Sequence, residues 1–145
     1  LTHINGYDVG SSSNDIGTSP ISKHRTGKTT GCVVDCIDNL VKQDLPYPTH
    51  LKVDVDGAEP DVIEGALKTL PNLKSILIEL FPTPQKNTSM YQYRKEHKKV
   101  IKDLEAMGFV LDEELYEVSA KRNDAHNSRF KGQRNYIFYG EDYAV

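Results

Sequence analysis

Residues 51–60 constrain the fold of this chain more than any other segment. Apolar and charged side chains alternate over the first six of these residues, and a period of two predicts a β-strand. Gly57 then frees the backbone, and Pro60 suits the first turn of a helix. The segment therefore predicts a strand that passes through a tight turn into a helix, with Asp54 and Asp56 on one strand face.

These two carboxylates occupy a position that favours function. In an open α/β sheet, ligands bind in the crevice outside the carboxyl ends of the strands. Charge placed there is costly unless something uses it. Asp54 or Asp56 alone could cap the next helix, but Glu59 adds a third acid at the helix start, which is more than one cap needs.

The next elements extend this unit into a parallel core. Apolar residues at helical spacing predict a helix from Glu59 to Pro71. Residues 75–81 form an apolar run typical of a strand buried on both faces, with Glu79 as its single charge. A right-handed crossover would make this strand the parallel neighbour of residues 52–55, which we expect to be a central strand.

The C-terminal half predicts one long helix and an antiparallel edge. A capping box at residues 89–92 starts a helix that ends at Gly108. Residues 109–111 and 115–118 are interpreted as a strand pair, and residues 119–134 as a loop. An aromatic strand at residues 135–139 closes the chain.

The N-terminal third carries weaker signals. Residues 4–9 suggest a short strand, and residues 10–15 read as a loop by composition. Residues 31–36 predict a strand, followed by a short turn or helix at residues 37–41. At 145 residues the chain fits one α/β domain, residues 1–145.

Charge and cysteine content exclude several classes of function. A net charge of −3 gives no electrostatic case for nucleic-acid binding, and no apolar run approaches the roughly 20 residues of a membrane span. On one strand, Cys32 and Cys36 would lie about 13 Å apart. That distance is too long for a disulfide, and the pair makes a poor zinc site, so we expect reduced thiols and a cytoplasmic protein.

Several motifs together resemble the FkbM-type methyltransferases. They are residues 52–59, 64–66, 76–80 and 135–138, and the resemblance covers about residues 32–140. It implies a Rossmann-like three-layer sandwich with a mostly parallel sheet and an antiparallel C-terminal edge. It also implies S-adenosylmethionine as cofactor and methyl transfer to a hydroxyl of a small molecule, sugar or lipid.

The chain departs from that family at the cofactor turn. Enzymes of this class open with a strand and a Gly-rich turn, and residues 8–10 are the one candidate. Only about forty residues separate them from the acidic strand, where two or three βα units of about 30 residues should intervene. Residues 4–17 are therefore interpreted as the third strand and its loop. We expect an incomplete class I fold that binds S-adenosylmethionine weakly or not at all.

The resemblance also assigns roles to the acidic residues. Asp54, Asp56 and Glu79 are the candidate catalytic residues, and Asp54, Asp56 and Gly57 the candidate cofactor-binding residues. The carboxylates could hold Mg²⁺ or contact the ammonium group of the cofactor, and the sequence leaves both open. His50 and His97 are expected on the surface, the latter within the charge run of residues 94–99.

Two other functions remain open at this point. Asp54 and Asp56 before Gly57 also resemble the first motif of haloacid-dehalogenase-type phosphatases, as nucleophile and acid/base with Mg²⁺. That motif expects Thr where this chain has Ala58, and its later acidic motif is missing. The second alternative is a truncated α/β module that binds a partner without catalysis.

Overall fold

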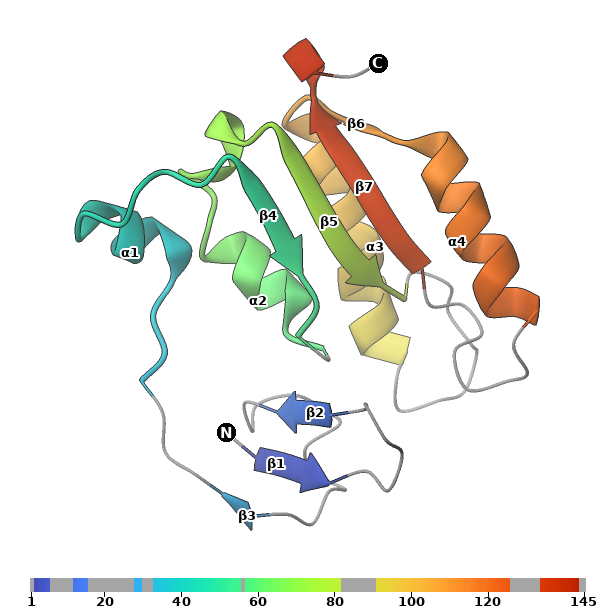
Figure 1. Ribbon diagram of the computed structural model, residues 1–145, viewed down its shortest axis with the longest axis horizontal. Coiled ribbons are helices and arrows are strands. Elements are labelled where there is room, and N and C mark those ends of the chain that lie inside the picture. Colours follow the sequence, from blue (N-terminus) through green and yellow to red (C-terminus); the bar gives the residue numbers. More distant parts are fainter. Residues whose placement is uncertain are drawn as a thin grey trace.

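The computed structural model describes residues 2–5, 12–15, 28–29, 33–55, 57–81, 91–125 and 134–143. Its main sheet has four strands in the order β4-β5-β7-β6 (Figure 1). Their bounds are His50–Val53 for β4, Ser75–Leu80 for β5, Arg134–Gly140 for β7 and Phe109–Leu111 for β6.

Strands β4 and β5 are parallel neighbours, as the sequence predicts. Leu51 pairs with Ile76 and Val53 with Ile78, and helix α2, Glu59–Glu64, lies in the connection between the strands. The expected central position of β4 is wrong for the described sheet, because β4 forms its edge. No described strand pairs with the other side of β4.

Strand β7 runs opposite to the other three strands. It pairs antiparallel with β5 on one side and with β6 on the other, so β4, β5 and β6 share one direction. The predicted antiparallel pairing of the late strands is confirmed, although β6 and not β7 is the outermost strand. This mixed sheet is compatible with a fragment of a Rossmann-like fold.

The hydrophobic core lies on one face of this sheet. Along β5, the buried residues Ile76, Ile78 and Leu80 alternate with half-buried ones. Helices α2 and α3, the latter Tyr91–Ala106, pack on the same core, to which α3 contributes Val100 and Leu104. The expectation that this strand is buried on both faces is therefore wrong, since its alternation is that of a sheet with one well-covered face.

Helix α4, Glu113–Ala125, replaces the strand and loop that the sequence predicts there. It runs along β7 beyond the point where β6 stops (Figure 1), and the Ser119 hydroxyl accepts the Asn135 N–H at 2.9 Å. The helix starts behind Asp112, whose Oδ1 accepts the Leu115 N–H at 2.9 Å, a typical N-cap. Because antiparallel strands need no crossover, α4 can lie at the sheet edge.

The described residues thus form two layers where three are expected. Helices α2 and α3 cover one face of the sheet, and α4 flanks its edge. Helix α1, Ile37–Lys42, packs instead on the turn after α2, where Asp38 accepts the N–H groups of Lys68 and Thr69. Along the second face, Leu77, Ile137 and Tyr139 are only half-buried.

The N-terminal strands belong to a separate antiparallel sheet with the order β2-β1-β3. Their bounds are Thr2–Asn5, Ser12–Asp15 and Lys28–Thr29 for β1, β2 and β3. The interpretation of residues 4–17 as the third strand of the parallel sheet is therefore wrong where the structure describes them. So is the loop expected at residues 10–15, since β2 falls within it.

Two boundaries near the core also differ from expectation. Residues 33–36 form no strand, whereas the helix expected after them is present as α1. Helix α2 ends at Glu64, and turns and the short 3₁₀ helix Leu70–Asn72 complete the segment up to β5. Cys36 is a free, half-buried thiol, and Cys32 lies outside the described residues.

Helix α3 ends as the sequence predicts. Gly108 follows it with a φ of 90°, a left-handed conformation that favours glycine at helix ends. The capping residue Ser89 lies outside the described residues. No helix among those described is both long enough and apolar enough to span a bilayer.

Candidate active site at the carboxyl ends of the parallel strands

The carboxyl ends of β4 and β5 meet at one edge of the main sheet, because the two strands are parallel. After β4 the chain turns through Gly57, whose φ of 121° is reserved for glycine. Pro60 then stands in the first turn of α2, as the sequence predicts. This strand-turn-helix geometry presents the acidic segment at the edge where α/β proteins bind ligands.

A row of polar side chains crosses this edge on the second face of the sheet. Val53 and Ile78 form the last pair of the β4–β5 ladder, and Asp54 and Glu79 directly follow them. On the other side of β5, Glu79 pairs with Asn135 of β7. Asp54 and Glu79, two of the predicted catalytic residues, therefore follow the two strands at the same sheet edge, and the structure adds Asn135, which the sequence alone did not single out.

Asp54 is exposed and carries a surface ion pair. Its Oδ2 lies 3.0 Å from the Lys52 ammonium, and 46% of the Asp54 side chain is accessible to solvent. Ion pairs with this exposure contribute about 0–1 kcal/mol. A ligand at the edge can therefore displace the Lys52 ammonium at little cost.

Glu59 holds the turn before α2 from inside the protein. Its side chain is 2% exposed, and its Oε1 accepts the N–H groups of Val55 and Gly57, each at 3.2 Å. A carboxylate that accepts two backbone donors satisfies groups that would otherwise lack partners at a strand end and a turn. Glu59 thus stabilises the backbone of the acidic turn through these two hydrogen bonds.

His97 of α3 completes a buried polar pair with Glu59. Its ring is fully buried, with Nε2 lying 3.3 Å from Glu59 Oε2. Its Nδ1 accepts the Phe81 N–H at 2.9 Å, just beyond the end of β5. The expectation that His97 is solvated is wrong, although its neighbours Glu96 and Lys98 are exposed as predicted.

The hydrogen bond from Phe81 indicates the tautomer of His97. A ring nitrogen that accepts a backbone N–H carries no proton, so the ring proton is on Nε2, which lies 3.3 Å from Glu59 Oε2. Burial by itself raises the pKa of Glu59, but the His97 ring and backbone N–H groups outweigh burial. The net result is a pKa for Glu59 below its ordinary value of 4.5.

The remaining predicted ligands fall outside what the structure describes. Asp56 and the candidate cofactor turn at residues 8–10 are not among the described residues. Within the described ranges, no three His, Cys, Asp or Glu side chains are grouped so as to hold a metal ion. Both predicted partners of Asp54, Asp56 and Glu79, Mg²⁺ and the cofactor ammonium, stay predictions.

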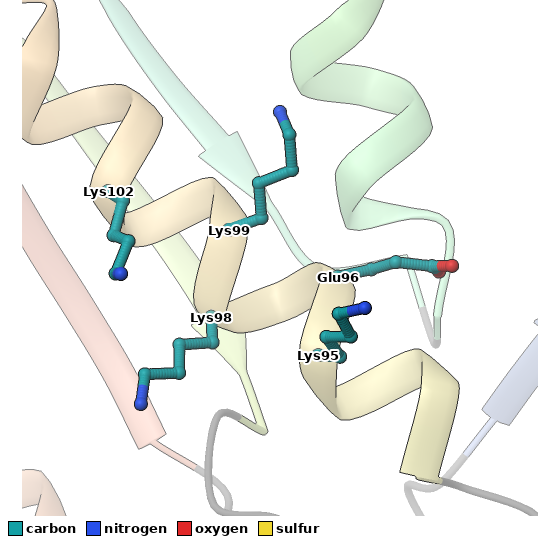
Figure 2. Close-up of a pocket in the computed structure, with 5 residues that line it drawn as sticks. All are labelled: Lys95, Glu96, Lys98, Lys99 and Lys102. Atoms are coloured by element: carbon teal, nitrogen blue, oxygen red, sulfur yellow. The ribbon is translucent and has the colours of Figure 1, made fainter.

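A second charged feature is a hollow of about 570 Å³ beside α3. It is lined by Glu96 and by Lys95, Lys98, Lys99 and Lys102. In Figure 2 the side chains of Lys98 and Lys102 point to one side of the helix, and those of Glu96 and Lys99 to the other. Lys99 also pairs with Asp103. Because these side chains diverge, they form a solvated helix face and no convergent site.

Comparisons with protein-family models, with curated proteins and with solved structures each found no match. The candidate site is thus defined by geometry. Asp54, Gly57 and Glu79 lie at one sheet edge, and the buried side chains of Glu59 and His97 contact the backbone of this edge from inside the protein.

The burial of His97 had a signal in the sequence. With Val100 and Leu104, it continues one helical face at positions i, i+3 and i+7.

Proposed function

We propose that this chain is the C-terminal portion of an S-adenosylmethionine-dependent methyltransferase that methylates a hydroxyl group. The observation that supports the proposal is that Asp54 and Glu79 directly follow Val53 and Ile78, the last pair at the carboxyl ends of two parallel strands. The sequence motifs that resemble FkbM-type methyltransferases run through these same strands. The antiparallel pairing of β7 also agrees with the sheet that the family implies.

The charge of the edge suits this cofactor. S-adenosylmethionine has a sulfonium cation and an ammonium group, and Asp54 and Glu79 offer carboxylates to attract them. When bound, it supplies the methyl group, whose bond to sulfur breaks as the bond to the acceptor oxygen forms. Asp54, which is exposed and pairs with the Lys52 ammonium, would take the proton of the acceptor hydroxyl as general base.

The acceptor class follows from the resemblance and from the exposed edge. We propose a sugar, a lipid or another small molecule with a free hydroxyl. Positioning that hydroxyl in line with the methyl group is the main contribution expected of the protein. The half-buried Glu79 and the exposed Asn135 lie where they could orient it.

The test is a titration of the ¹⁵N-labelled chain with S-adenosylhomocysteine, followed by amide chemical shifts. We expect weak binding, in the roughly millimolar range, with shifts confined to the ends of β4 and β5. Asp54→Asn should weaken this binding, whereas Asp61→Asn, which changes an exposed acid of α2, should leave it unchanged. A parallel titration with EDTA present tests whether Mg²⁺ takes part.

Three results would contradict the proposal or part of it. Shifts confined to other parts of the chain, or binding that Asp54→Asn leaves unchanged, would remove the assignment of the site to the β4 and β5 ends. Submicromolar binding would show that residues 8–10 do form the cofactor turn. Hydrolysis of a phosphate monoester that depends on Mg²⁺ and Asp54 would favour the phosphatase alternative instead.

A further inference from the structure

We propose that Glu59 and His97 are positioning residues that couple the two loops of the candidate active site. The proposal rests on the proposed function, since it assigns a role within that same edge. Neither side chain needs to touch substrate. Their role is to keep the segment after β4 and the segment after β5 at one mutual distance, and with them Asp54 and Glu79.

The coupling follows one unbroken chain of polar contacts. It starts at the N–H groups of Val55 and Gly57, passes through the Glu59 carboxylate and the His97 ring, and ends at the Phe81 N–H. Val55 directly follows Asp54, and Phe81 lies two residues after Glu79. A shift of either loop would therefore lengthen a contact inside the core.

Burial and directionality argue that this pair does more than fill space. Both side chains are at most 2% exposed, and a buried ionic or polar pair generally adds no more stability than apolar residues of the same volume. An apolar pair, however, could not accept the three backbone N–H groups that these two side chains accept. Moreover, only the tautomer with the proton on Nε2 accepts from Phe81 while it donates toward Glu59.

The first test concerns the pair itself and needs no ligand. Side-chain ¹⁵N shifts of His97 at neutral pH should show a neutral ring protonated on Nε2. Proton on Nδ1, or a charged ring, would overturn the proposal, because the link to Phe81 would then be absent. This readout uses the unmodified protein and does not depend on whether a variant folds.

Two substitutions of His97 then remove different contacts from this series of polar interactions. His97→Gln can still place a donor near Glu59 but loses the acceptor for Phe81, and His97→Asn can keep an acceptor near Phe81 but loses the reach to Glu59. We expect His97→Gln to speed hydrogen exchange of the Phe81 amide about tenfold, and His97→Asn to do the same for Val55 and Gly57, as expected for one lost hydrogen bond. His50→Gln, at an exposed histidine, is the control.

The second test links the pair to ligand binding. If wild type binds S-adenosylhomocysteine, His97→Gln should weaken binding several-fold while His50→Gln does not. Equal binding by wild type and a folded His97→Gln, with the Phe81 amide released, would show that the coupling does not position the site. If wild type shows no binding, the outcome that a chain without the Gly-rich cofactor turn allows, the tautomer and exchange results by themselves decide whether the ends of β4 and β5 are coupled.

Discussion

Replacing Glu59 by Gln gives the sharpest test of how the acidic turn is held. The substitution keeps the shape of the side chain and removes its charge. The Gln oxygen can still accept the N–H groups of Val55 and Gly57, which Glu59 Oε1 accepts at 3.2 Å. The Gln amide NH₂ then faces the Nε2–H of His97, where Oε2 now lies 3.3 Å away, so two donors oppose each other.

No rearrangement removes this mismatch. If His97 moves its proton to Nδ1, that proton meets the Phe81 N–H, which Nδ1 accepts in the native protein. If the Gln amide flips, its NH₂ group meets the two backbone donors instead. Each alternative leaves at least one buried donor without an acceptor, which costs about 1–3 kcal/mol.

The loss of charge adds to this cost. A hydrogen bond to a charged group contributes about 1 kcal/mol more than a neutral one, and two backbone bonds to Glu59 lose that increment. The free energy of unfolding should therefore fall by about 3–5 kcal/mol in Glu59→Gln, the range for breaking a buried pair. Urea denaturation at neutral pH measures this change in the free energy of unfolding, provided that the two proteins have the same m-value.

The matched control is Glu64→Gln, at an exposed glutamate of the same helix. It should change the free energy of unfolding by less than about 0.5 kcal/mol. A Glu59→Gln variant within about 1 kcal/mol of wild type would refute the reasoning. It would mean that the pair contributes little to the native state.

Three further predictions follow from the same structure. The pKa of Glu59 lies below 4.5 in the folded protein, so the stability that its ionised form contributes is complete above that pH and is lost as the pH falls through the folded pKa. Acid denaturation followed by circular dichroism should therefore show a steeper loss of folded protein below pH 4.5 in wild type than in Glu59→Gln. Under the proposed function, Asp54→Asn should lower methyl transfer by the full-length protein by roughly 10²-fold or more with little change in melting temperature, and near wild-type turnover would show that Asp54 has only a structural role. Leu104→Ala, which creates a cavity at a fully buried position in the core, should lower the free energy of unfolding by about 2–5 kcal/mol, as measured by chemical denaturation. A loss below about 1 kcal/mol would contradict the burial of this face of α3.

Elements encoded by local patterns could be predicted from the sequence. The alternation before Gly57, the glycine itself and Pro60 specify a strand, a turn and a helix through backbone conformation alone, and β4, the turn and α2 follow that order. The helical period of α3 and its stop at Gly108 are likewise local. Their identification required no knowledge of distant contacts.

Elements decided by distant partners could not be predicted in the same way. The sequence predicts a strand at residues 115–118 and a loop at residues 119–134, yet residues 113–125 form α4, which contacts β7 and accepts the Asn135 N–H through Ser119. Strand β2 falls where composition predicts a loop, and it depends on pairing with β1. In both cases the stabilising contacts lie outside the segment whose pattern was interpreted.

The same distinction between local patterns and distant contacts applies to the candidate site. The sequence by itself determined that acidic residues would stand at a strand-to-helix turn, because alternation and glycine act within a few residues. Only the tertiary structure decided that Asp54 and Glu79 stand at one sheet edge, that the second face of the sheet stays half-buried, and that His97 is buried against Glu59. Register between strands and the partner of a buried charge are set by packing between residues that are distant along the chain. Glu59 and His97 are 38 positions apart, and Ser75 and Tyr139, which pair between β5 and β7, are 64 positions apart.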